Sequence, residues 1–218
     1  MLRISASRRA ATALGMLAIL IFAAPAGRAA GVPCRVPAAA EVIARDGSSK
    51  AWRVTTGGAP GAPDRRSYFA CERGGAPFRF EHGDTGASSL TDVPAAAIRG
   101  RRFAYGRVRK YGLGTARALV IVRHLRTHKV TFVRRAVSKT LELESFHRVV
   151  VRSNGNVAWI ASNIDGEGIS TYEVYKHDQN GTVRLDIGTD IARGYLRLTS
   201  GGRVQWKRDG ALKSAPLS

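Results

Sequence analysis

An aromatic residue recurs at nearly even intervals along the chain, and each occurrence ends a similar phrase. The intervals are 53, 54 and 47 residues, and the four aromatics are Trp52, Tyr105, Trp159 and Trp206. In three copies a short segment (DGSS, SNGN or SGGR) separates an apolar run from the aromatic run. Gly, Asn, Asp and Ser tolerate the positive φ angles of tight hairpins. The phrase therefore predicts strand, turn and strand, and its recurrence predicts a fold of repeated units.

A second hairpin follows the first in the first three copies. Its sequences are YFACERGGAPFRFEHG, ALVIVRHLRTHKVTFV and YEVYKHDQNGTVRLDIG, which are rich in residues that favour half-buried, pleated strands. Four antiparallel strands in about 50 residues are typical of a β-propeller blade. We predict four repeats at about residues 41–83, 95–133, 147–188 and 194–218.

The fourth copy is short, and this leaves two ways of ending the fold. Only GALKSAPLS follows RVQWKRD, which is enough for a third strand but hardly for a fourth. The segment GVPCRVP before the first copy could supply the missing strand and close a ring. We therefore predict one all-β domain, residues 31–218, as a four-unit β-propeller-like repeat of four-stranded antiparallel sheets. The alternatives are an open half-propeller and a β-sandwich.

The recurring aromatics are predicted to be core residues rather than a platform for binding sugars. One such sheet buries only part of its apolar surface, so neighbouring units must stack. Trp and Tyr suit these contacts because they bury a large apolar body and keep one polar group that needs a partner. We expect Trp52, Tyr105, Trp159 and Trp206 to pack between units.

The N-terminal residues have the pattern of a secretory signal. Arg3, Arg8 and Arg9 precede the uncharged run AATALGMLAILIFAAPAG, and small residues follow. This order predicts a signal peptide over residues 1–30 with cleavage near Ala30. No later run is long enough to span a bilayer. We expect a secreted or cell-envelope protein with no membrane span after cleavage.

The two cysteines of the chain are predicted to form a disulfide. In an exported protein an even pair is typical of a structural bridge, and Cys34 and Cys71 carry no CxxC pattern. The bridge would join the start of the mature chain to the first repeat.

The charge of the chain is strongly positive. It is +19 over the whole sequence. Removal of the four arginines in residues 1–30 leaves +15. A protein partner or an anionic envelope polymer would fit this charge. The competing interpretation is compositional, because Ala, Gly and Arg enrichment is typical of high-GC coding sequences and the basic residues are scattered. No motif indicates specific binding of nucleic acid.

The sequence predicts no catalytic, metal or cofactor site. His124 and His128 have the spacing of a helical zinc pair, but they fall on a predicted strand and its turn. Asn163, Asp165 and Glu167 alternate like part of a calcium loop, although a hairpin tip explains them equally well. There is no GxSxG elbow and no thiol left after pairing.

The third copy carries a resemblance to a known family. Its two phrases, RVVVRSNGNVAWIAS and YEVYKHDQNGTVRLDIG, resemble the blades of TolB-type β-propellers, in which spDGxxIAF precedes ydiyvxDxdGxxxrxLT. The chain is also similar to exported proteins of high-GC bacteria with degenerate blades of this kind. The resemblance covers most of residues 34–218 and implies a propeller-like fold; its motifs assign no chemistry.

These features together predict an exported, non-catalytic binding or scaffold module. The expected ligand is a protein or an acidic polymer of the cell envelope, held by loops and scattered arginines. The alternative is a hydrolase built on a propeller, with its site in the central mouth.

Overall fold

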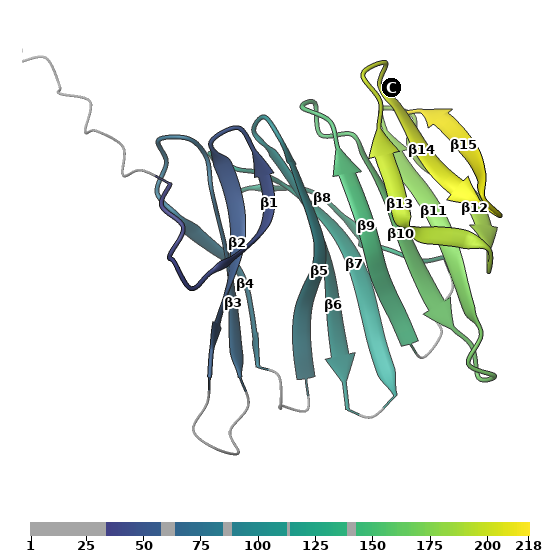
Figure 1. Cartoon of the computed structure of the whole chain (residues 1–218), viewed down its shortest axis with the longest axis horizontal. Helices are drawn as coiled ribbons and strands as arrows, with labels where there is room; N and C mark the ends of the chain where they lie inside the picture. The colour runs from purple at the N-terminus through teal and green to yellow at the C-terminus, as the bar shows by residue number, and fades with distance from the viewer. Residues whose placement is uncertain (1–33, 58–63, 85–88, 113, 139–142) are drawn as a thin grey trace, which may run out of the picture.

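The computed structural model describes residues 34–57, 64–84, 89–112, 114–138 and 143–218. These residues form strands and turns and no helix (Figure 1), so the prediction of an all-β protein is confirmed. None of them forms a helix that is long and apolar enough to cross a bilayer. The predicted signal peptide, residues 1–30, lies outside the described residues.

The strands follow one another in antiparallel groups, which we call units 1 to 4. Unit 1 consists of β1 (Glu41–Asp46), β2 (Ser49–Thr56), β3 (Arg65–Cys71) and β4 (Phe78–Asp84). Unit 2 consists of β5 (Ser89–Arg99), β6 (Arg102–Tyr111), β7 (Thr115–His124) and β8 (Val130–Arg135). Unit 3 consists of β9 (Leu143–Val151), β10 (Val157–Ile164), β11 (Ser170–Asp178) and β12 (Gly181–Gly188). Unit 4 has three strands, β13 (Ile191–Leu198), β14 (Arg203–Arg208) and β15 (Ala211–Pro216).

The units stand side by side, with their first strands along one edge (Figure 1). In the stack β1 lies beside β5, β5 beside β9, and β9 beside β13. Within a unit each strand pairs with the next one in sequence. One parallel pair, Ala116 with Leu143, also joins β7 to β9. Units 2 and 3 therefore belong to one eight-stranded sheet.

Three of the four recurring aromatics are buried against the preceding unit and hydrogen-bonded to it. Tyr105 donates to Glu81 of unit 1 at 3.1 Å. Trp159 donates from Nε1 to the carbonyl of Ala136, after β8, at 2.8 Å. Trp206 donates to Asp186 of unit 3 at 2.7 Å. Each ring therefore fills the apolar space between two units while its polar tip is satisfied by the earlier one.

Trp52 is the exception, because it belongs to the first of the four described units. It lies on the outer face of unit 1, stacked on Phe69 with ring centroids 5.8 Å apart, and is 2% exposed. Its Nε1 is buried without a hydrogen-bond acceptor among the described residues. The neighbouring residue, Ala51, faces the opposite way into the core between units 1 and 2.

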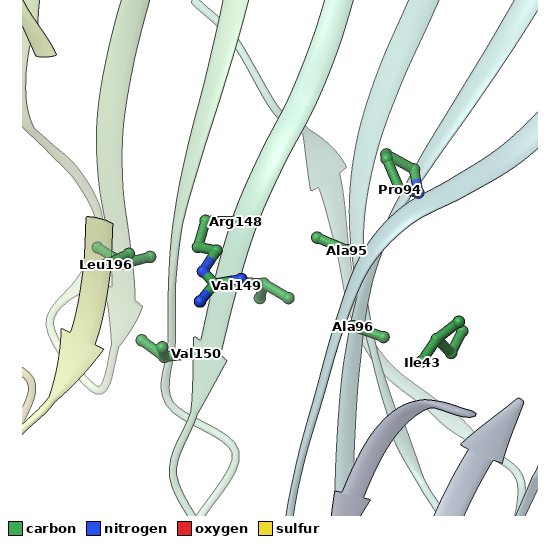
Figure 2. Close-up of a pocket in the computed structure, with 8 residues that line it drawn as sticks. All are labelled: Ile43, Pro94, Ala95, Ala96, Arg148, Val149, Val150 and Leu196. Atoms are coloured by element: carbon green, nitrogen blue, oxygen red, sulfur yellow. The ribbon is translucent and has the colours of Figure 1, made fainter. Parts of the chain in front are cut away.

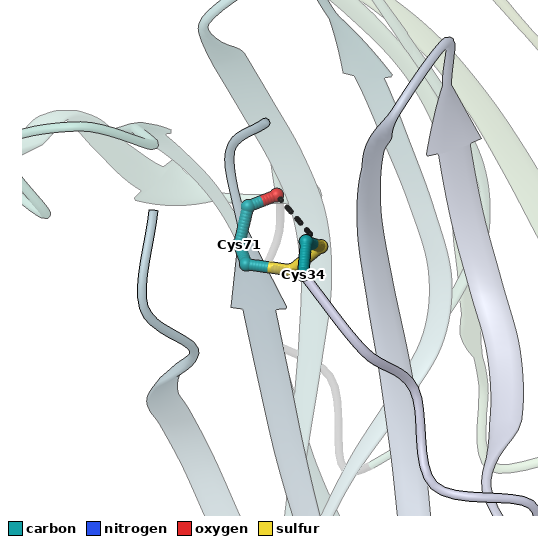
Figure 3. Close-up of a disulfide and its surroundings, with 2 residues drawn as sticks. All are labelled: Cys34 and Cys71. Atoms are coloured by element: carbon teal, nitrogen blue, oxygen red, sulfur yellow. Dashed lines mark hydrogen bonds between the residues drawn. A yellow bond between two sulfur atoms is a disulfide. The ribbon is translucent and has the colours of Figure 1, made fainter. Parts of the chain in front are cut away.

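A strap of residues 34–40 crosses this outer face. The predicted disulfide between Cys34 and Cys71 is present and fixes the strap to the end of β3 (Figure 3). Arg35 and Pro37 of the strap line a hollow together with Trp52. Hence the prediction that GVPCRVP completes the last unit is wrong for its described residues, 34–37. The disulfide holds them on the first unit instead.

The opposite end of the stack has a polar outer face. Val204 and Trp206 are buried against unit 3, so Gln205 and Lys207 between and beyond them point outward. The side chain of Lys207 also lies 4.9 Å from the centre of the Tyr195 ring. The two end faces are thus finished differently, and the sheets do not close into a ring.

Units 2 and 3 approach each other closely at Gly106, and a substitution there tests how tightly they pack. A Cβ atom added at Gly106 of β6 would lie 2.0 Å from Cδ1 of Phe146 in β9. We expect Gly106→Ala to lower the free energy of unfolding by about 2 kcal/mol, because an overpacked core must shift to admit the methyl group.

The matched control is Gly166→Ala, where an added Cβ meets no atom within 4 Å. Urea unfolding of both variants and the wild type measures the difference. Equal stability of the two variants would contradict the described contact between units 2 and 3.

Candidate anion-binding groove

The first strands of all four units line a hollow at the inner edge of the stack. It has a volume of about 260 Å³, and Figure 2 shows its residues on neighbouring strands. The lining residues are Ile43, Pro94, Ala95, Ala96, Arg148, Val149, Val150 and Leu196. Most of its lining side chains are small or apolar, but the surface that they expose to the hollow is mostly polar, from backbone groups and Arg148, which also supplies the charge.

Two further hollows adjoin this one. The first shares Ile43 and is lined also by Val42, Ala44, Arg45 and Lys50. The second shares Pro94 and is lined also by Leu90, Asp92, Val108, Lys110, Ser145, Phe146 and His147. We call the three adjoining hollows the inner groove. The groove exists because the units stack through their first strands.

The charge of the inner groove is positive. Its four cations have no carboxylate partner within ion-pair distance in the described part of the chain: Arg45, Lys50, Lys110 and Arg148. One carboxylate, Asp92, is among the described lining residues. It accepts a hydrogen bond from the Tyr68 hydroxyl at 2.6 Å and another from Arg66 at 3.4 Å. The negative charge of the groove is therefore already engaged.

Several described acidic residues join neighbouring units and are therefore not partners of the groove cations. Glu144 is buried and accepts from the backbone N–H of Ala118 at 2.8 Å, and it also pairs with Arg135. Glu173 is buried and accepts from the Tyr175 hydroxyl at 2.6 Å. A buried carboxylate needs such partners to offset its lost hydration.

The pKa of Glu173 reflects two opposing effects, burial and hydrogen bonding. Burial acts to raise it, but hydrogen bonds from Tyr175, Ser138 and Arg184 outweigh burial and lower the pKa below its ordinary value. Glu173 is therefore ionised at neutral pH and serves as a structural anion between units 2 and 3.

His147 lies in the wall of the groove next to Arg148. Its Nε2 is 2.8 Å from Oγ of Ser162. Burial, and then the charge of Arg193 on β13, lower the pKa of His147 to about 4. The ring is therefore neutral at pH 7, and Arg193 contributes a further positive charge near the groove.

The sequence patterns that resemble metal sites have structural roles in turns. His124 accepts at Nδ1 from the backbone N–H groups of Arg126 and Thr127, at 3.2 and 3.3 Å. His128 stacks on Phe78 with ring centroids 3.9 Å apart. These two histidines do not converge on a shared ligand position.

The calcium-like pattern likewise stabilises a hairpin. Asp165 accepts from the backbone N–H groups of Glu167 and Ile169, at 3.0 and 2.9 Å, while Asn163 donates to Glu173. Within the described ranges no group of three or more His, Cys, Asp or Glu side chains could hold a metal ion.

Little in the sequence indicates that the cations of the inner groove lie close together. Lys110 belongs to the short basic run VRKYG, whereas Arg45 and Arg148 stand about 100 residues apart, in the first strands of units 1 and 3. The stacking of the units brings these two arginines to one edge. The buried aromatics Trp52, Tyr105, Trp159 and Trp206 lie in the sheets, outside the groove lining.

The lowered pKa of His147 predicts a pH dependence of stability. The unfolded pKa of His is about 6.5, so the unfolded chain takes up the proton first as the pH falls. The contribution of His147 is complete above about pH 6.5 and is lost as the pH falls towards 4. We expect His147→Gln to flatten the dependence of the unfolding free energy on pH in this window.

Urea unfolding of both proteins between about pH 7 and about pH 5 measures this effect. The pKa of His177 is also lowered, first by burial, but His177 is present in both proteins. The difference between their slopes therefore belongs to His147. Identical slopes would contradict the buried position of its ring.

Comparison with known proteins gives only distant similarity. No protein-family model and no curated protein matches the chain. One similar solved structure is a Penicillium chrysogenum alpha-L-arabinanase complexed with arabinobiose, with 11% identity, a TM-score of 0.41, and coverage of 77% of this chain and 56% of that one. Another is a Pyrococcus horikoshii acylaminoacyl peptidase, with 8% identity, a TM-score of 0.38, and coverage of 80% and 39%. The chain thus spans little more than half of the first protein and about two fifths of the second.

Proposed function

We propose that the chain is an exported, open propeller-like module that binds an acidic polymer of the cell envelope without chemical conversion. The observation that carries this proposal is the inner groove. It brings four cations without carboxylate partners in the described part of the chain to one edge of the stack. The disulfide between Cys34 and Cys71 is compatible with the oxidising compartments in which such proteins work.

The shape of the groove favours a chain-like ligand. Its three hollows adjoin one another through Ile43 and Pro94, so a ligand could run across the first strands of several units. The side chains around Pro94 and Ala96 are small, and most of the exposed lining surface is polar, which leaves room and hydrogen-bonding groups for a polymer backbone. Arg148 then offers a planar fork that pairs with carboxylate or phosphate through two hydrogen bonds.

The alternative is a hydrolase with its site in the same groove. Asp92, Ser145 and His147 line one of the hollows and are the residue types such a site would use. However, Asp92 is engaged by Tyr68. The hydroxyl that contacts His147 belongs to Ser162, which is 2% exposed and so out of reach of a substrate. Binding without catalysis is therefore the better supported function.

Charge reversal in the groove tests the proposal. We expect the protein to bind polyglutamate or polyphosphate at low salt and to release it at high salt (about 0.02 M and about 0.5 M). The double variant Arg148→Glu and Arg193→Glu should bind roughly tenfold more weakly or worse, which is a loss of about 1.4 kcal/mol. Fluorescence anisotropy of a labelled polymer measures the affinity.

The matched control reverses two exposed arginines outside the groove lining, Arg117 and Arg126, and so changes the net charge equally. The proposal requires this control to bind nearly as well as the wild type. An equal loss in both double variants would show that overall charge, not the groove, attracts the polymer. Absence of binding at low salt would refute the polymer and leave a protein ligand.

A further inference from the structure

A second, more apolar hollow lies on the outer face of unit 1. It has a volume of about 420 Å³ and shares no lining residue with the inner groove. The residues used below are Arg35, Pro37, Trp52, Val54, Phe69 and Pro77. Its volume is in the range of small-molecule sites, about 300 to 1,000 Å³.

Trp52 belongs to the first of the four described units, and the strap, not another described unit, lies over it. The equivalent rings of Tyr105 and Trp159 are packed under such a unit. Among the described residues the narrow strap crosses Trp52 and the stacked Phe69, and its residue Pro37 forms part of the wall. Trp52 is 2% exposed, so the apolar surface open to a ligand comes mainly from the half-buried side chains of Phe69 and Val54, with Trp52 beneath them.

One cation stands at this recess. Arg35 is exposed and has no carboxylate within ion-pair distance in the described ranges. It directly follows Cys34, which the disulfide holds to Cys71 (Figure 3). No described lining residue of the hollow is acidic. The backbone that carries Arg35 is thus fixed beside an apolar recess that contains no opposing charge.

We propose that this hollow binds a hydrophobic anion, a small molecule with an acyl or aryl body and a carboxylate or phosphate head. The body packs on Phe69 and Val54 and reaches the edge of Trp52, because burial of apolar surface away from water is favourable. The head pairs with Arg35 at the rim. A stable protein interface would need about 800 Å² on each partner, whereas here the strap occupies part of the face, so a small ligand fits better than a second sheet.

Decanoate is the probe, and decyltrimethylammonium and octyl glucoside are its cationic and neutral counterparts. We expect decanoate to bind and to shift the indole N–H resonance of Trp52 in a ¹⁵N-correlated spectrum. That resonance is assigned by its absence in Trp52→Phe. Decyl phosphate, tested in parallel, shows whether the site prefers a phosphate or a carboxylate head.

Two rim variants separate the charge from the fold. Arg35→Glu and Pro37→Glu both alter exposed strap positions, and each should weaken decanoate binding roughly tenfold or more by placing a carboxylate beside the head group. Arg35→Lys should retain part of the affinity. The control Arg126→Glu makes the same charge change on the exposed turn after β7 and should bind like the wild type.

Several results would overturn the proposal. They are equal binding of the cationic and anionic probes, equal losses for Arg35→Glu and Arg126→Glu, no binding of any probe, and a dimer in sedimentation that Pro37→Glu dissociates. The last result would assign the hollow to a second copy of the chain. The groove variant Arg148→Glu with Arg193→Glu should keep its affinity for decanoate, so failure of the polymer proposal and failure of this one are distinguishable.

Discussion

The stack depends on the contact between an aromatic ring in the second strand of a unit and the unit before it. A four-stranded sheet has two faces, and water on both would leave too little apolar surface buried for stability. Tyr105, Trp159 and Trp206 solve this with one arrangement, since each fills the space between two sheets and donates its polar hydrogen to the earlier one. The order of the units in space therefore follows their order in the chain.

The same constraint explains the two ends of the stack. On unit 1, the first described unit, a strap held by the disulfide of Cys34 and Cys71 lies over Trp52. Unit 4 is the last described unit, and its outer face carries Gln205 and Lys207 where the inner units carry small or apolar residues. Polar terminal faces are how stacked repeats stay soluble. Unit 4 has such a polar face, whereas unit 1 has the strap and an apolar hollow. The sheets do not close into a ring, and the inner edge remains an open groove.

The charged residues fall into two groups: those that stabilise the fold and those that are available to a ligand. Acidic side chains such as Glu144 and Glu173 are buried between units and satisfied there. Since the basic residues outnumber them about two to one, the surplus stays on the surface. The first strands bring part of that surplus together around Arg148. The positive charge can therefore have a compositional origin and still serve binding. An excess of arginine that arises from base composition forms a binding surface wherever the fold brings the arginines together.

Local patterns determined the all-β class and the hairpins, because alternation and turn residues act within a few positions of the chain. The disulfide could also be predicted from the sequence, because two cysteines allow only one pairing. The site of the strap was predicted wrongly, because the sequence does not say which sheet face residues 34–37 meet. Arg45 and Arg148 carried no joint signal, since they meet only through the stacking of β1, β5 and β9. The sequence by itself thus determined the repeated hairpins and their buried aromatics, while the tertiary structure alone decided how the stack ends and where its charge gathers, because both depend on contacts between residues far apart in the chain.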